Sequence, residues 1–273
     1  MIYLSTATYF EGETLIKMLS LKKDNNITKF QVFKSQNATL IITGCGRISS
    51  TAALTYLFSI MNPASTDLLI NFGICGTVNK DLKPGTTFLC SKISEHSTGK
   101  TFYTDVLYKS PFQEKFLETF DTPVTSHSTH IEGDLIDMEA SGIYQAATLF
   151  FMTHQIYFIK MVSDYIGDNI HKDDIKNKLN DSSQRVVKWI KEISTQLVPK
   201  GEILSPKDIE LLNDIAANLK YSVTMKNELR KKFIYCKLST GVIPLDLKRY
   251  SKIPCKSKKE GQVYGEAIDE ELI

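Results

Sequence analysis

Three acidic residues stand where predicted strands give way to loops or helices. Glu11 follows an apolar, β-prone run, Glu139 lies at the start of a predicted helix, and Asp164 ends the run IYFIKMVSD. Ligands of open α/β sheets bind beyond the carboxyl ends of the strands, so we expect these acids to converge on one pocket. Glu13 is the alternative to Glu11, and the position of Leu15 favours Glu11. Carboxyl groups gathered in such a pocket can act as general acid and general base.

The segment 135–147, LIDMEASGIYQAA, carries Asp137 and Glu139 at the start of an otherwise apolar run. A carboxylate in the first turn of a helix accepts hydrogen bonds from unpaired backbone N–H groups and lies at the positive end of the helix dipole. Either carboxylate could therefore be only a helix cap. Because Glu139 recurs with Glu11 and Asp164 at the ends of strands and the starts of helices, we interpret Glu139 as a residue that binds a ligand and Asp137 as a helix cap.

Strands alternate with helices over about residues 1–197. Runs of β-branched and aromatic residues bounded by turn residues predict strands, and apolar residues spaced by three and four predict amphipathic helices. This alternation predicts a layered α/β domain. The predicted strands cover residues 2–8, 30–35, 38–44, 67–73, 84–96 and 156–164, and the predicted helices cover 13–21, 48–61, 111–121, 140–152 and 173–197.

Residues 198–273 are predicted to form a small helical extension. The run VPKGEILSP ends the α/β domain, which gives domain boundaries of 1–197 and 198–273. In SPKDIELLNDIAANLK, Ser205 is a good N-cap and Pro206 occupies the first helical position. The segment 224–238, TMKNELRKKFIYCKL, is a second predicted helix.

Charge is distributed unevenly in this extension, although the net charge of the chain is +2. Residues 220–259 hold 12 basic and 2 acidic side chains, and residues 260–273 hold 5 acidic and no basic ones. The preferred interpretation is a solvated helical face. Contact with nucleic acid phosphates, with Tyr235 or Tyr250 stacking on bases, is less favoured. A third interpretation is a docking surface for an acidic protein partner.

Composition excludes several classes of protein. With 273 residues, of which 42% are hydrophobic, the chain can bury a substantial core. It has no apolar stretch near the roughly 20 residues of a membrane span, and its start lacks the pattern of a signal peptide, so we expect a cytoplasmic protein with no membrane partner. The five cysteines are widely spaced and form no CxxC motif, which argues against a disulfide framework and a zinc site.

Three motifs, INFGICGTV, IDMEASGIY and MVSD, resemble in order and spacing the signatures of the nucleoside phosphorylase/nucleosidase superfamily. The pattern is most similar to that of the 5′-methylthioadenosine/S-adenosylhomocysteine nucleosidases. The resemblance covers about residues 1–197, and nothing in 198–273 belongs to the usual chain of that family. It implies an α/β fold with a central mixed β-sheet flanked by helices, hydrolysis of a purine N-glycosidic bond, no metal or organic cofactor, and a homodimer.

The resemblance also implies roles for individual residues. Glu139 would accept hydrogen bonds from the ribose 2′- and 3′-hydroxyls, and Met138 would pack against the ribose. Asp164 would donate a proton to purine N7, which requires burial or a carboxylate neighbour to raise its pKa. Glu11 would orient and deprotonate the water that attacks the anomeric carbon.

The segment INFGICGT supplies two further candidate substrate-binding residues, Gly73 and Ile74, and it departs from the family pattern. Ile74 stands where the nucleosidases usually carry a serine that hydrogen-bonds the catalytic aspartate. The change removes an orienting partner of Asp164, so we expect slower chemistry or a water in the serine's place.

The loop before the MEA motif is shortened to THIEGDLID, although the family places an aromatic residue over the purine there. His127, His130 and Tyr165 are the candidates to replace that stacking surface. A single loop histidine is more often a solvated side chain.

Phosphorolysis is the alternative reaction, and it requires a cationic site for phosphate. Arg47 in GCGRIS is the one basic residue near a glycine loop, and Asn71 occupies the neighbourhood where the phosphorylases carry an arginine. A surface position is the favoured interpretation of Arg47, so hydrolysis of a 5′-modified adenosine is preferred. A catalytically weakened protein that binds nucleosides is a further alternative, indicated by Ile74 and the shortened loop.

Overall fold

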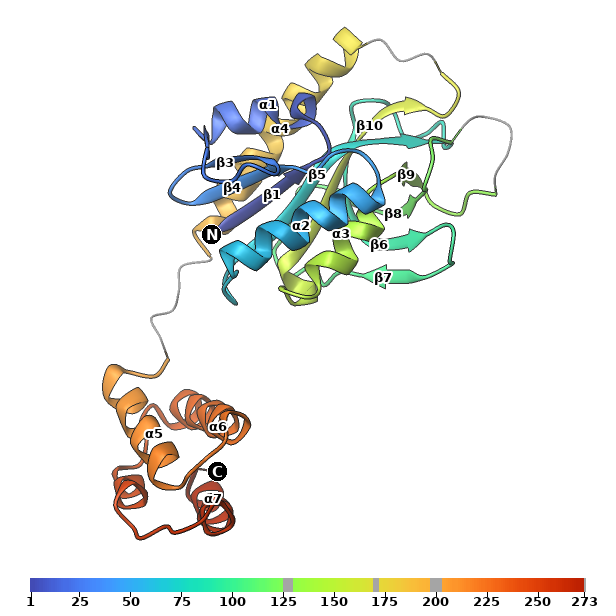
Figure 1. Cartoon of the computed structure of the whole chain (residues 1–273). Helices are drawn as coiled ribbons and strands as arrows, with labels where there is room; N and C mark the ends of the chain where they lie inside the picture. Colours follow the sequence, from blue (N-terminus) through green and yellow to red (C-terminus); the bar gives the residue numbers. More distant parts are fainter. Residues whose placement is uncertain (125–129, 169–171, 197–202, 273) are drawn as a thin grey trace. The chain divides into compact units, whose positions relative to one another are not determined.

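The computed structural model describes residues 1–124, 130–168, 172–196 and 203–272 (Figure 1). The chain divides into two compact units, residues 1–198 and 199–273, which are described separately. None of the helices in these described ranges is both long enough and apolar enough to span a membrane.

The first unit is built on a mixed sheet of ten strands in the described part of the chain. The strand order is β10-β6-β8-β9-β5-β1-β4-β3-β2, with β7 paired to β6. Because β10 also pairs with β5, the strands β5, β10, β6, β8 and β9 close into a ring. The strands are β1 (Ile2–Thr6), β2 (Lys22–Lys23), β3 (Gln31–Lys34), β4 (Ala38–Ile42), β5 (Leu68–Thr77), β6 (Thr87–Glu95), β7 (Thr101–Tyr103), β8 (Gln113–Thr119), β9 (Leu135–Asp137) and β10 (Ile156–Tyr165).

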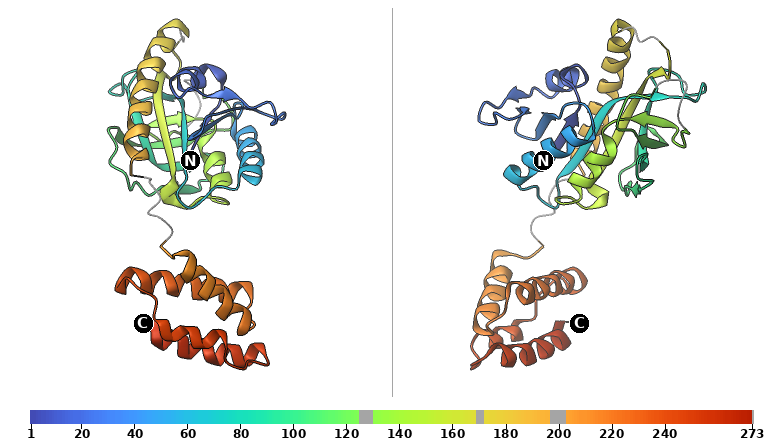
Figure 2. Two further views of the ribbon diagram at one scale, coloured as in Figure 1. Left: turned by 90° about the vertical axis from the view of Figure 1, so that its left-hand side faces the viewer. Right: turned by 45° about the vertical axis from the view of Figure 1, so that its right-hand side comes forward.

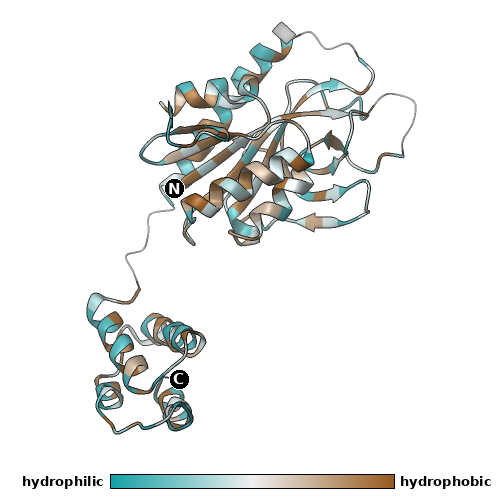
Figure 3. Ribbon diagram, viewed as in Figure 1, coloured by the Kyte–Doolittle hydropathy of each residue, from teal (hydrophilic) through white to brown (hydrophobic). Residues whose placement is uncertain are grey.

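Helices cover both faces of this sheet (Figure 2). The helices α1 (Tyr9–Met18) and α4 (Lys172–Ser194) pack on one face. The helices α2 (Arg47–Met61) and α3 (Ala140–Ala147) pack together on the other. The central strands between them are largely hydrophobic (Figure 3), as expected for strands that are buried on both faces.

The strand β10 places one charged side chain inside this core. Tyr157 and Ile159 pack in the layer of α1 and α4, whereas Phe158 and Val162 pack in the layer of α2 and α3. Since successive side chains of a strand face opposite sides, Lys160 belongs to the α2–α3 layer, where it is only 2% exposed. A buried ammonium group requires compensating negative charge.

Most elements agree with the sequence-based predictions, and the predicted fold class, a mixed sheet flanked by helices, is confirmed. The predicted hairpin is the antiparallel pair β3–β4. The helix predicted at 111–121 is wrong, because β8 occupies Gln113–Thr119 and pairs in parallel with both β6 and β9. Pairing inside the sheet overrides local propensity there. The helix predicted over 140–152 ends at Ala147.

The second unit is a small helical bundle. The helix α5 begins after Ser205, the predicted N-cap residue, with Pro206 at its start, and the Ser205 side chain also forms a capping box with Asp208. The unit has its own core, centred on Phe233 and Leu247. Its elements are α5 (Pro206–Asn218), α6 (Val223–Thr240), the 3-10 helix η2 (Leu245–Ser251) and α7 (Lys258–Leu272).

Ion pairs within the second unit account for part of its uneven charge. Lys232 on α6 pairs with Asp269 on α7 at 2.5 Å, and Lys237 pairs with Asp208 on α5 at 2.9 Å. Arg249 also pairs with Glu271. The acidic end of the chain therefore neutralises part of the basic stretch before it.

We predict that the two units unfold separately. Phe233→Ala removes a fully buried ring of the second unit and should destabilise that unit by about 3–5 kcal/mol. The single tryptophan, Trp189, is buried in α4 of the first unit and reports on that unit alone. In urea unfolding, the variant should lower the midpoint seen by far-ultraviolet circular dichroism and leave the midpoint of Trp189 fluorescence unchanged.

Phe72→Ala is the matched control, because Phe72 is a fully buried ring of the first unit. It should lower the fluorescence midpoint. A lowered fluorescence midpoint in Phe233→Ala would contradict separate unfolding.

Candidate active site

The three acids predicted from the sequence line one cavity of about 600 Å³. Glu11 reaches it from α1, Glu139 from the start of α3, and Asp164 from the end of β10. The cavity lies beyond the carboxyl ends of the parallel strands β1, β5 and β10, where α/β sheets bind ligands. The lining in the described part is Ala7, Thr8, Glu11, Cys45, Ile74, Cys75, Gly76, Thr122, Pro123, Val124, Ile136, Asp137, Met138, Glu139, Ser163, Asp164, Ile166, Gly167 and Asp168.

Glu11 is fixed by backbone and side-chain donors on one side of the cavity. Its Oε2 accepts hydrogen bonds from Thr8 N at 2.7 Å and Thr8 Oγ1 at 2.9 Å, and the bond from Thr8 N together with the one that Glu11 N donates to Thr8 Oγ1 forms the capping box of α1. Its Oε1 accepts a hydrogen bond from Ile74 N at 3.0 Å. The carboxylate is 5% exposed and has a single orientation set by α1 and β5.

Glu139 is the N-cap residue of α3, but its side chain does not cap that helix. Its Oε1 instead accepts a hydrogen bond from Gly46 N at 2.8 Å, at the start of α2. Burial and the neighbouring charge of Asp137 raise the pKa of Glu139 above its ordinary value, while Lys160 opposes them. Its carboxylate can therefore gain from further donors, such as hydroxyl groups of a ligand.

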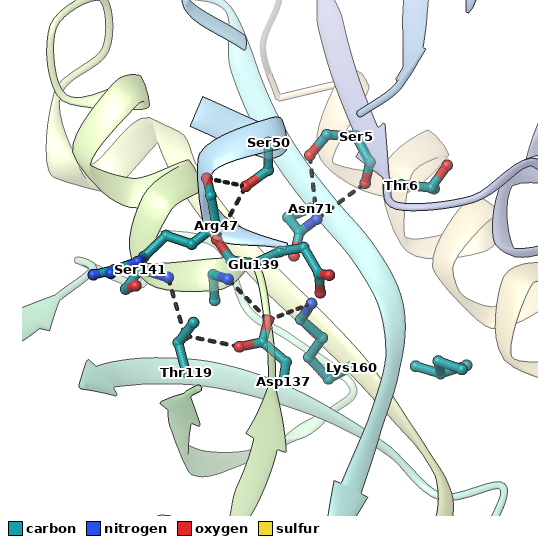
Figure 4. Close-up of polar contacts among 12 residues, drawn as sticks. Ser5, Thr6, Arg47, Ser50, Asn71, Thr119, Asp137, Glu139, Ser141 and Lys160 are labelled. Carbon is teal, nitrogen blue, oxygen red and sulfur yellow. Dashed lines mark hydrogen bonds and ion pairs between the residues drawn. The ribbon is translucent and has the colours of Figure 1, made fainter. Parts of the chain in front are cut away.

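Asp137 and Lys160 form a buried ion pair beside Glu139 (Figure 4). Lys160 Nζ lies 2.8 Å from Asp137 Oδ2, and Thr119 Oγ1 donates to Asp137 Oδ1 at 2.8 Å. Burial acts to lower the pKa of Lys160, but Asp137 and Glu139 outweigh it and raise the pKa, so the lysine is charged. The predicted cap contact is present, since Ala140 N donates to Asp137 Oδ2 at 2.9 Å. However, Asp137 ends β9 and is mainly the partner of Lys160.

Asp164 is half-buried and lines the same cavity. Burial raises the pKa of its carboxyl group above the ordinary value, and Asp168 adds to this, while a hydrogen bond from Ser163 opposes them. A carboxyl group with a raised pKa is suited to donate a proton near neutral pH.

The other predicted binding residues are close to these acids. Met138 and Ile74 line the cavity. Gly73 lies behind Glu11 and outside the described lining: a Cβ atom there would stand 2.8 Å from Glu11 Oε1 and 3.7 Å from Lys160 Nζ. The side chains of Glu11 and Lys160 thus both lie against the backbone of Gly73. A side chain at this position would displace the carboxylate of Glu11.

Two of the stacking candidates, His130 and Tyr165, are absent from the described lining of the cavity. His130 is exposed near Glu132, and Tyr165 OH donates to Lys80 O at 3.1 Å. His127 lies outside the described residues. Pro123 and Val124 are among the apolar residues of the described lining.

Two further candidates are occupied elsewhere. Glu13 pairs with Lys17 at 2.6 Å, which supports the choice of Glu11 over Glu13. The phosphate interpretation of Arg47 finds no support, because Arg47 is absent from the described lining and its guanidinium pairs with Glu95 and, at 2.7 Å, with Asp121. Two carboxylates would compete with any anion for this cation.

The sequence reasoning overlooked two polar residues of the site, Lys160 and Ser163. Lys160 had a detectable signal, since it is the one charge within the apolar run IYFIKMV. Together the residues supply a carboxylate beside a cation, a carboxylate open to hydroxyl donors, and a carboxyl group with a raised pKa. This set can hold a polyhydroxylated ligand while one group takes a proton and another gives one.

No family model and no curated protein matches the chain. Solved structures do match it. A 5′-methylthioadenosine/S-adenosylhomocysteine nucleosidase from Neisseria meningitidis, in complex with methylthio-immucillin-A, aligns with a TM-score of 0.58 and 18% identity over 68% of this chain and 96% of that chain. A Chlamydia trachomatis nucleosidase bound to methylthioadenosine aligns with a TM-score of 0.55 and 22% identity, covering 72% and 98%. A futalosine hydrolase mutant from Helicobacter pylori aligns with a TM-score of 0.58 and 13% identity over 70% of this chain and 98% of that chain.

The first unit therefore has the fold of the nucleoside phosphorylases and nucleosidases. Within that class its fold is similar to that of the methylthioadenosine/adenosylhomocysteine nucleosidases, as the sequence motifs predict. At these identities the likeness concerns the fold.

Lys160→Met should destabilise the first unit strongly, because it leaves Asp137 and Glu139 buried without a compensating cation. We expect a loss of about 3–5 kcal/mol in the free energy of unfolding at pH 7, measured by urea titration of Trp189 fluorescence. The loss should shrink as the pH falls, since protonation of the carboxylates removes the uncompensated charge.

Lys17→Met is the control, because it breaks the exposed pair with Glu13 and should change stability little. Equal stability of the two variants would contradict the structural role of Lys160.

Proposed function

We propose that the protein is a purine nucleosidase that hydrolyses the N-glycosidic bond of a 5′-modified adenosine and releases adenine. The observation that carries this proposal is the convergence of Glu11, Glu139 and Asp164 on one cavity of about 600 Å³. That volume suits a purine nucleoside, since small-molecule sites commonly enclose about 300–1,000 Å³.

Glu139 binds the ribose in this proposal. Its carboxylate has one backbone donor, Gly46 N, and accepts the 2′- and 3′-hydroxyls as further donors. Met138, which adjoins it in the cavity lining, packs against the sugar. Fixing the ribose in this way orients the anomeric carbon between the other two acids.

The reaction is a displacement by water. Asp164 gives its proton to purine N7, so the electron pair of the breaking C1′–N9 bond leaves on a neutral base. The oxygen of the water forms the new bond to C1′, and Glu11 takes the proton of that water. Burial supports the acid role of Asp164 by raising its pKa, and the three donors to Glu11 hold its carboxylate toward the water.

The ion pairs formed by Arg47 favour hydrolysis over phosphorolysis. Its guanidinium is engaged by Glu95 and Asp121, so it offers no free cation to phosphate. The solved structures of similar fold point in the same direction, because they are of nucleosidases and a futalosine hydrolase. Methylthioadenosine, adenosylhomocysteine and 5′-deoxyadenosine are the substrates to test first. The homodimer, the cytoplasmic location and a protein partner for the second unit are further parts of the proposal.

The test is release of free base from these three nucleosides and inosine, with and without phosphate. We expect adenine from 5′-modified adenosines without phosphate. Glu11→Gln and Asp164→Asn should each lower kcat by about 10²- to 10⁴-fold, because each removes a proton-transfer group.

Glu13→Gln is the matched control on the same helix, since Glu13 faces Lys17 rather than the cavity, and it should keep wild-type turnover. Strict dependence on phosphate would instead indicate a phosphorylase. Binding of nucleoside without turnover would indicate a catalytically weakened protein.

A further inference from the structure

The end of β10 is irregular at Ser163. In the pairing of β10 with β5, Val162 lies opposite Cys75 and Asp164 lies opposite Gly76, so Ser163 is an extra residue in β10. Such a bulge bends the strand and redirects side chains. As a result Ser163 and Asp164, which would face opposite sides of a regular strand, both line the cavity.

The hydroxyl of Ser163 has two acceptors within reach. Ser163 Oγ lies 3.1 Å from Cys75 O and also hydrogen-bonds Asp164 Oδ1. A serine hydroxyl carries one hydrogen, so it can donate fully to only one of them at a time. Ser163 is itself buried, although it lines the cavity.

We propose that Ser163 is the positioning residue for Asp164, in place of the serine that the nucleosidases usually carry where this chain has Ile74. This inference deepens the proposed function and rests on it. Ser163 holds Oδ1 of the carboxyl group, so the other oxygen, Oδ2, is left for the nitrogen of the purine. In the described residues no other side chain or backbone donor hydrogen-bonds Asp164.

The hydrogen bond strengthens during the reaction. When Asp164 has given its proton to the purine, its carboxylate is charged, and the Ser163 hydroxyl, which has both Cys75 O and Oδ1 within reach, donates fully to Oδ1. A hydrogen bond to an ionised acceptor is about twice as strong as one between neutral groups. Ser163 therefore stabilises the state in which the base has been protonated, and the bulge that brings it to Asp164 is what makes this contact.

Ser163 also acts on the pKa of Asp164, in the direction opposite to burial and Asp168. Burial and Asp168 raise the pKa of Asp164, whereas the hydrogen bond from Ser163 lowers it. Removal of the hydroxyl should therefore raise this pKa further. Among the described residues, the titratable groups near Asp164 are Asp168 after β10 and Cys75 on β5. Glu11 on α1, Asp137 on β9 and Glu139 before α3 line the same cavity, and Lys160 on β10 pairs with Asp137.

The first test is the pH dependence of kcat for methylthioadenosine in Ser163→Ala. Turnover needs protonated Asp164, so it declines as the pH rises through the pKa of this group, and a higher pKa moves the decline to higher pH. We expect kcat to fall about tenfold at the optimum, as for the loss of one hydrogen bond, with KM nearly unchanged. Ser163→Thr keeps the hydroxyl and should restore kcat and the profile.

Ser183→Ala is the control variant. Ser183 is a buried serine of α4 whose hydroxyl has no hydrogen-bond partner in the described part of the chain. This variant should leave kcat and the profile unchanged. Loss of turnover in Ser163→Ala with no shift of the profile and no rescue by threonine would overturn the proposal.

A second measurement does not depend on catalysis. Carbon-13 NMR titration of the Asp164 carboxyl in the ligand-free protein, assigned with Asp164→Asn, gives its pKa directly. A higher pKa in Ser163→Ala than in wild type supports the positioning contact even if the wild type releases no base, in which case only the proposed function fails. An unchanged pKa overturns the inference.

Discussion

The whole site depends on the buried cation Lys160, which compensates the charge of the carboxylates around it. The strands β5 and β10 are largely apolar, yet the nearby residues Glu11, Asp137 and Glu139 are all buried. Without Lys160 these carboxylates would carry uncompensated charge in a medium of low dielectric constant. The ion pair with Asp137 leaves Glu11 and Glu139 near the cation but free to contact a ligand. One lysine thus permits several carboxylates at the carboxyl ends of three parallel strands.

Backbone groups then give each acid its orientation. The start of α1 fixes Glu11 through Thr8, the start of α2 fixes Glu139 through Gly46, and the bulge in β10 sets Asp164 beside Ser163. The starts of α1 and α2 and the bulge in β10 supply hydrogen-bond donors to the acids. In a regular sheet the backbone donors are used in hydrogen bonds between strands. The acids are therefore held by rigid elements, as a site that transfers protons requires.

The sequence predicted the layered fold and the three acids, because both follow from local patterns: apolar runs ending in acids, and motifs with fixed spacing. It did not predict β8, since Gln113–Thr119 becomes a strand only through its pairing with β6 and β9. It also missed the roles of Lys160 and Ser163. The partner of Lys160 lies 23 residues earlier in the chain, and the contact of Ser163 with Asp164 depends on a bulge between β10 and β5. Local pattern marks Lys160 as a charge within an apolar run, but it does not identify the partner of Lys160 or the contact of Ser163.

The most direct test of the central claim is a crystal structure of the Asp164→Asn variant with methylthioadenosine. The account predicts the nucleoside in the cavity, with both ribose hydroxyls on Glu139, purine N7 at residue 164, and a water between Glu11 and the anomeric carbon. A nucleoside bound elsewhere on the protein, or one whose ribose makes no contact with Glu139, would contradict it.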